Sequence, residues 1–178
     1  MSLIRDRARR HAHHTLHRVE EEVGGYDDAG RVPLHGYAGS LVAFAASVAG
    51  LALAGRRSGA SLPERYSVSD IAIGGIATHK FTRLLSKGSV TSPLRAPFTE
   101  FEAPAGSAEH HEQARGGGVR HTIGELLTCP FCLGQWVGTG YVVGLALAPR
   151  PARTWAAVFA VTGVSDALQQ VYARLRVA

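Results

Sequence analysis

The stretch GYAGSLVAFAASVAGLALAG, residues 36–55, contains twenty residues and no charged side chain. A helix rises about 1.5 Å per residue, so this length spans roughly 30 Å, the hydrocarbon thickness of a bilayer. Arg56 and Arg57 follow directly. The stretch predicts a transmembrane helix, and it decides the fold class.

Three further apolar segments follow along the chain. Residues 67–85 have a short uncharged centre, with Ser67 or Ser69 as the expected N-cap and Asp70 in the first turn. This segment predicts a spanning or half-spanning helix, and an amphipathic helix lying in the interface is the alternative. The other two candidate membrane segments are residues 133–148, extended by the preceding Cys-Pro-Phe-Cys, and residues 154–172. We therefore expect an all-α integral membrane helical bundle of three to four transmembrane helices within residues 36–178.

The distribution of Lys and Arg predicts the orientation of this bundle. With four spans and a cytoplasmic N-terminus, fourteen of the 19 Lys and Arg residues face the cytoplasm and five face the outside. Both termini and a polar loop over residues 86–125, which includes the flexible-looking AGSAEHHEQARGGG, are then cytoplasmic. We expect a bacterial plasma (inner) membrane location.

Residues 1–35 are expected to form a polar, flexible cytoplasmic segment. They begin MSLIRDRARRHAHHTLH, which has no apolar core after its basic residues, so a cleavable signal peptide is not expected. The histidines at positions 11, 13, 14 and 17 lie among arginines, whose charge opposes metal binding. A solvated basic tail that attracts anionic lipid headgroups is favoured instead.

The composition excludes several classes of protein. The chain has 178 residues, a net charge of +5 and 46% apolar residues, and its charges gather in a few segments. A soluble protein mixes charge into every amphipathic helix, so this segregation favours a membrane protein. Two cysteines exclude a scaffold held by several disulfides. No nucleic-acid partner is expected, because the positive charge lies against the predicted spans.

Both cysteines lie in GELLTCPFCLGQW, residues 124–136, with two residues between them. Such a pair forms a disulfide, transfers electrons or provides two thiolates to a metal. A thioredoxin-like strand–helix pattern and a second cysteine pair are both missing from the sequence. The structural alternative is a helix that begins at Pro130, with two small apolar thiols packed against its neighbours.

A zinc or iron site at Cys129 and Cys132 needs further ligands. His121 and Glu125 are four residues apart, as are Glu125 and Cys129, so these side chains share one helix face. The other possible sources of metal ligands are His79, Asp70 and a second subunit.

The segment THKFTRLLSKGSVTSPLRAPFTEFE, residues 78–102, gathers basic residues among hydroxyls beyond an apolar run. Cations with hydroxyls suit phosphate or lipid headgroups, and an ordinary positive loop is the alternative. The chain lacks P-loop, GxSxG and HExxH patterns.

These two segments, separated by a glycine-rich gap, resemble a bacterial membrane family catalogued as domain of unknown function 1360, some of whose relatives carry a sporulation-protein label. The resemblance covers roughly residues 66–172 and implies an integral membrane protein, without an activity or catalytic residues. The positions that match the family signature are His79, Lys80, Arg83, Lys87, Arg95, Pro97, Glu100, Glu125, Cys129, Pro130, Cys132 and Trp136.

Two functional hypotheses follow. The first is a non-enzymatic interaction or accessory protein of the bacterial envelope, embedded in the lipid bilayer and able to form a homo-oligomer. The second is a membrane enzyme with a metal or thiol site at Cys129 and Cys132, in which Arg83 and Arg95 hold an anionic headgroup.

Overall fold

The computed structural model describes residue 26 and residues 32–59, 63–106 and 108–177. The chain divides into two compact units, Met1–His35 and Gly36–Ala178. The helices and strands that the structure describes lie in the second unit, apart from the first two residues of the first described helix. The four N-terminal histidines, and most of the expected polar segment, lie outside the described residues.

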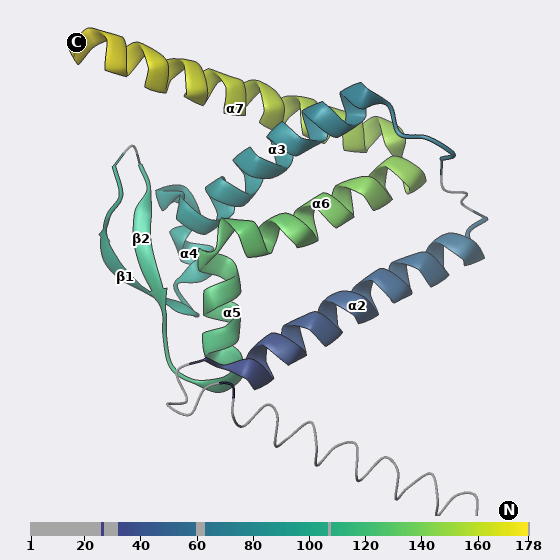
Figure 1. Cartoon of the computed structure of the whole chain (residues 1–178), viewed down its shortest axis with the longest axis horizontal. Helices are drawn as coiled ribbons and strands as arrows, with labels where there is room; N and C mark the ends of the chain where they lie inside the picture. Colours follow the sequence, from purple (N-terminus) through teal and green to yellow (C-terminus); the bar gives the residue numbers. More distant parts are fainter. Residues whose placement is uncertain (1–25, 27–31, 60–62, 107, 178) are drawn as a thin grey trace, which may run out of the picture. The chain divides into compact units, whose positions relative to one another are not determined.

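Four long helices dominate the described chain (Figure 1). They are α2 (Leu34–Arg57), α3 (Val68–Lys87), α6 (Pro130–Leu147) and α7 (Pro149–Val177). The N-cap of α3 is Ser67, whose hydroxyl accepts the Asp70 N–H at 3.0 Å, as expected from the sequence. The mainly helical fold is therefore confirmed.

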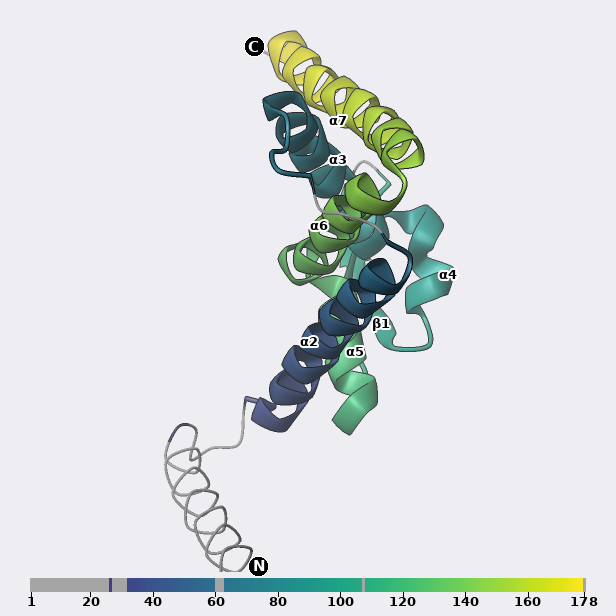
Figure 2. The same cartoon turned by 90° about the vertical axis from the view of Figure 1, so that its right-hand side faces the viewer.

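Helix α3 packs against both α7 and α6 (Figures 1 and 2). The core between them contains Ala77, Tyr141, Leu145 and Ala156. Gly74 makes this packing possible, because a Cβ at that position would overlap the Tyr141 ring. Small residues thus allow the three helices to approach closely.

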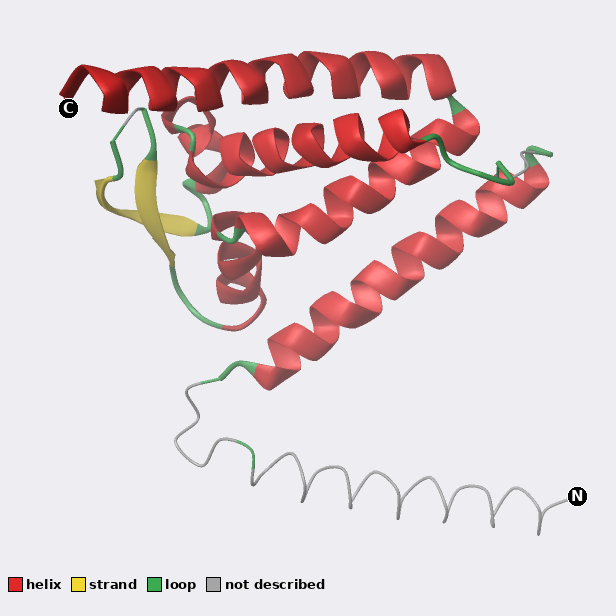
Figure 3. Cartoon of the chain, turned by 45° about the horizontal axis from the view of Figure 1, so that its top comes forward, coloured by secondary structure: helices red, strands yellow, loops and turns green. Residues whose placement is uncertain are grey.

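A β-hairpin lies between α4 and α5 in the chain, and Figure 3 shows it as the two strands beside the helices. After a 3-10 turn (Ser89–Thr91) and the short α4 (Ser92–Arg95), β1 (Thr99–Pro104) pairs antiparallel with β2 (His110–Ala114). Thr99 lies opposite Ala114, and the register shifts between Phe101 and Ala103.

The expectation of an all-α chain holds only in part, because residues 99–104 and 110–114, expected to be loop, form this small sheet. The strands TEFEAP and HHEQA are polar and have no clear apolar alternation, so their pattern does not signal a sheet. Side chains outside the strands fix them instead, above all that of Arg95, which binds Glu112 of β2.

Helix α5 (Gly118–Thr128) meets α6 at a bend of 80°. Cys129 is both the C-cap of α5 and the N-cap of α6, and Pro130 occupies the first turn of α6. Proline suits this position because a first-turn N–H needs no helical partner. The bend therefore lies exactly at the cysteine pair.

By length and composition, one helix of the described chain, α2, is able to cross a membrane. The bent pair of α5 and α6 adds a second candidate if it counts as one broken or re-entrant span. The described chain thus holds one or two candidate spans, and the expected three to four spans stay a prediction.

Candidate functional site

The basic segment, residues 78–102, begins within α3, and carboxylates of the chain pair with several of its cations. Lys80 pairs with Asp166 of α7. Arg83 donates to both oxygens of Glu109, at 2.7 and 2.6 Å. These pairs connect α3 to α7 and to the hairpin, so the segment is first of all a structural connector.

Arg95 is the most deeply buried of these cations, with 1% of its side chain exposed. Its Nε and Nη2 donate to the two carboxylate oxygens of Glu112 at 2.8 and 2.6 Å. The remaining guanidinium N–H groups donate to Leu85 O, Gly88 O and the hydroxyls of Thr91 and Ser92. The expected role of Arg95 as a headgroup ligand is therefore wrong, because its donors are used inside the protein.

Glu112 is equally enclosed, with 5% of its side chain exposed. Burial alone would raise its pKa, but hydrogen bonds from Arg95, Thr99 and Ser92 outweigh burial and lower the pKa from 4.5 to about 2. The carboxylate is thus charged at neutral pH, which suits its buried cationic partner.

The other signature positions outside the cysteine region are mostly structural. The Pro97 carbonyl accepts two N–H groups of Arg120, and Glu100 lies 3.5 Å from Arg115. Trp136 packs edge-on against Phe44 of α2, with ring centroids 5.1 Å apart. His79 is exposed on α3, and Lys87 is half-buried at the end of that helix.

The α5–α6 corner gathers the reactive side chains. The Cys129 Sγ accepts the Cys132 N–H at 3.2 Å, and the two thiols lie within hydrogen-bonding reach of each other. Neither cysteine is in a disulfide; Cys132 is exposed and Cys129 half-buried. We define the corner site as Tyr37, His121, Glu125, Cys129 and Cys132.

Three of these side chains, from α2 and α5, contact one another through the Glu125 carboxylate. The Tyr37 hydroxyl donates to Glu125 Oε1 at 3.3 Å, and His121 Nε2 lies 3.7 Å from the same oxygen. His121 Nδ1 and Glu125 Oε2 are buried, and neither has a hydrogen-bond partner within the described part of the chain. The sequence predicted the closeness of His121 and Glu125, and a shared site with Cys129 stays a prediction. It missed Tyr37, which lies 88 residues from Glu125 in the chain.

The metal hypothesis stays a prediction. Across the described ranges, no group of three His, Cys, Asp or Glu side chains is placed to hold a metal ion. Asp70, one of the possible ligands, instead binds Arg153 Nε and Nη2 at 2.8 and 2.9 Å. His79 likewise belongs to α3 and not to the corner site.

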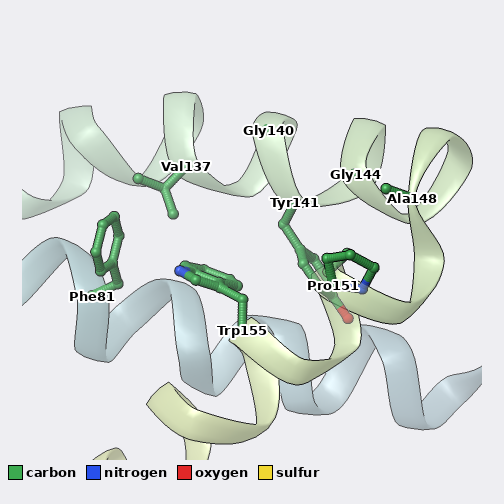
Figure 4. Close-up of a pocket in the computed structure, with 9 residues that line it drawn as sticks. Phe81, Val137, Gly140, Tyr141, Gly144, Ala148, Pro151 and Trp155 are labelled. Atoms are coloured by element: carbon green, nitrogen blue, oxygen red, sulfur yellow. The ribbon is translucent and has the colours of Figure 1, made fainter.

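A second feature is an apolar pocket of about 410 Å³ between α3, α6 and α7. Figure 4 shows Phe81, Val137, Tyr141 and Trp155 around it. Its lining holds no acid, thiol or histidine. The pocket therefore suits an apolar group.

Comparison with known proteins now adds to this geometry. A family model described as "Protein of unknown function (DUF1360)" matches residues 73–172, more than half of the chain. The chain belongs to this family. It is also similar to "Sporulation protein YjcA" of Bacillus subtilis (strain 168), with 28% identity over 107 residues, which cover 58% of this chain and 91% of the relative. No solved structure matches.

The match confirms the family resemblance inferred from the two sequence segments. The DUF1360 region runs from within α3 to within α7 and includes both Arg95 and the cysteine pair. It leaves out α2, and with it Tyr37. The family description assigns no function, so an activity has to be argued from the side chains themselves.

Proposed function

We propose that this DUF1360 protein is an integral membrane protein of the bacterial envelope that works by binding other components there. The observation that carries this proposal is the apolar surface that the fold leaves uncovered. No residue of α2 is buried, and Leu41 and Val42 are among its exposed side chains. Large exposed apolar surfaces are uncommon on soluble monomers and mark sites of contact with a membrane or another protein.

Helices α3 and α7 support the same proposal. Ile71, Ile73 and Ile76 are exposed on α3, although α3 is packed between two helices. The C-terminal half of α7 exposes a run of large apolar side chains: Val164, Leu168, Val171, Tyr172 and Leu175. A bilayer, or a second copy of the chain within it, is an environment that would cover these faces.

We propose that four helices are inserted in a plasma membrane: α2, α3, α6 and α7. Both termini then lie on the cytoplasmic side. The end of α3 and the start of α6 both adjoin the hairpin region, which suits a cytoplasmic connection between two spans. Lys80 and Asp166 would then be neutralised as a pair, as charges between membrane helices usually are.

Anionic lipid headgroups are the second expected contact. Because Arg83 and Arg95 are engaged with carboxylates, we assign this role to the basic helix ends. Arg56 and Arg57 end α2, and Arg174 and Arg176 lie in the last turn of α7. Cations at a helix end reach the headgroups while the helix stays in the hydrocarbon.

The biological setting is an envelope process. The Bacillus relative carries the name of a sporulation protein, and we propose that this chain serves as an accessory protein in a process of that kind, as a monomer or homo-oligomer.

Membrane extraction tests the first part of the proposal. Membranes from cells that express the chain are washed at alkaline pH and then dissolved in detergent. We expect the protein to stay in the alkaline pellet and to enter detergent, and its release by the wash would contradict integral insertion.

A membrane-impermeant maleimide tests the orientation: Cys132 should react after the membrane is opened and not in intact cells.

A further inference from the structure

The bend between α5 and α6 brings two accessible thiols to one helix start. Cys132 is exposed and Cys129 half-buried, and the Cys132 N–H donates to Cys129 Sγ at 3.2 Å. Cysteines that serve only as packing residues are among the most buried side chains of a protein. This pair is instead open to a reaction partner.

The same geometry distinguishes the two sulfurs. Reactive cysteines are found at helix N-termini, and Cys129 Sγ lies at the N-cap of α6, where it accepts the Cys132 N–H. The Cys132 thiol is within hydrogen-bonding reach of this sulfur. Cys129 is therefore the better nucleophile, and Cys132 is placed to attack any bond formed on Cys129.

Phe131, between the cysteines, is 87% exposed. Exposed aromatic rings are frequent anchors for polypeptide partners. A ring at this place offers an apolar contact directly beside the sulfurs, which favours a polypeptide over a small soluble disulfide.

We propose that Cys129 and Cys132 form a dithiol that reduces a disulfide in a partner polypeptide. Cys129 Sγ bonds to one sulfur of that disulfide, and the other sulfur leaves with the proton that Cys129 loses. Cys132 Sγ then attacks Cys129 Sγ, and the second partner sulfur leaves with the proton of Cys132. The products are a Cys129–Cys132 disulfide and a partner dithiol, so two electrons pass to the partner. This activity goes beyond the proposed membrane role and does not depend on it.

Alkylation of the purified full-length protein tests the exchange. The reduced chain in detergent is incubated with excess peptide that contains one disulfide, quenched with a maleimide and weighed by mass spectrometry. We expect both cysteines to become protected, one peptide disulfide to be reduced per chain, and Cys132→Ser to retain a covalently bound peptide. Two alkylated cysteines after incubation, thiols protected by one bound zinc ion, or peptide retained by Cys129→Ser in place of Cys132→Ser would overturn the proposal.

The partner class has its own test. The rate at which the Cys129/Cys132 dithiol is oxidised is measured with the peptide disulfide and with glutathione disulfide. The variant Phe131→Ala is compared with a control, Phe101→Ala, which removes an exposed ring on β1. We expect Phe131→Ala to slow the peptide reaction at least five-fold and to leave the glutathione reaction and the control unchanged. Equal slowing of both reactions, or no slowing, would refute recognition of a polypeptide through Phe131.

Discussion

The guanidinium of Arg95 and the carboxylate of Glu112 form a two-point ion pair, with 1% and 5% of the two side chains exposed. Arg95 ends the short helix α4, and Glu112 lies in β2. The pair therefore fastens the hairpin to the end of α3, and it accounts for an ordered sheet in a stretch that has few apolar side chains.

Glu112→Gln should destabilise the protein strongly. The change leaves the buried charge of Arg95 without its counter-charge, which costs about 3–5 kcal/mol in comparable sites. The measurement is thermal or denaturant unfolding of the detergent-solubilised chain. Glu100→Gln is the matched control, since Glu100 is exposed on β1 and should cost below about 1 kcal/mol. Equal effects of the two changes would contradict the structural role of the buried pair.

Stability should also fall in acid because of Glu112. Its pKa is near 4.5 in the unfolded chain and about 2 in the folded one, so between these values the unfolded state binds more protons. The contribution of Glu112 is complete above about pH 4.5 and is lost as the pH falls towards 2. Unfolding midpoints of the wild type and of Glu112→Gln, measured across this range, should converge as the pH falls; a constant gap would count against the assignment.

Gly74→Ala should weaken the contact between α3 and α6. A Cβ at Gly74 would overlap the Tyr141 ring, whereas a Cβ at Gly75 meets nothing within 4 Å. Forced overpacking costs about 1–3 kcal/mol, and alanine at an open helical position is neutral or stabilising by up to about 1 kcal/mol. Unfolding of the two variants side by side tests the close approach, and a neutral Gly74→Ala would show that the ring moves away freely.

Val48→Arg should impair insertion of α2. Val48 is an exposed apolar residue well inside Leu34–Arg57, and an arginine near a helix centre costs about 2.5–3.5 kcal/mol on insertion. Ala38→Arg, near the start of α2, is the control because its charge reaches the interface. A phosphatase reporter fused after Gly59, active only outside the cytoplasm, should lose activity in the first variant alone. Unchanged activity in Val48→Arg would argue against α2 as a span.

The sequence predicted what depends on local pattern. The uncharged run of α2, the Ser67 cap and the helix that begins at Pro130 each follow from residues within a few positions of one another. The shared face of His121 and Glu125 was predictable for the same reason. Local rules of helix formation thus account for most of the helical part of the fold.

The contacts that the sequence did not predict join residues that are far apart in the chain. Arg83 and Glu109 are 26 residues apart, and Tyr37 and Glu125 are separated by 88. Helical spacing carries no information about such pairs, so the sequence suggested only an ordinary positive loop or a surface for phosphate or lipid headgroups. Glu112 of HHEQA and the nearby Glu109 were the available signal, since two acids follow the basic segment and pair in order with Arg83 and Arg95.

The close contact at Gly124 connects the hairpin to the helix that carries the corner site. A Cβ there would lie 2.5 Å from the Phe98 carbonyl oxygen and 2.9 Å from the Ala114 Cβ, so α5 rests directly on the base of the hairpin. Rigid elements in such contact move together. A partner that displaced the hairpin would therefore also displace α5. The two cysteines at the C-terminal end of α5 would move with it, so binding at the hairpin would change their position.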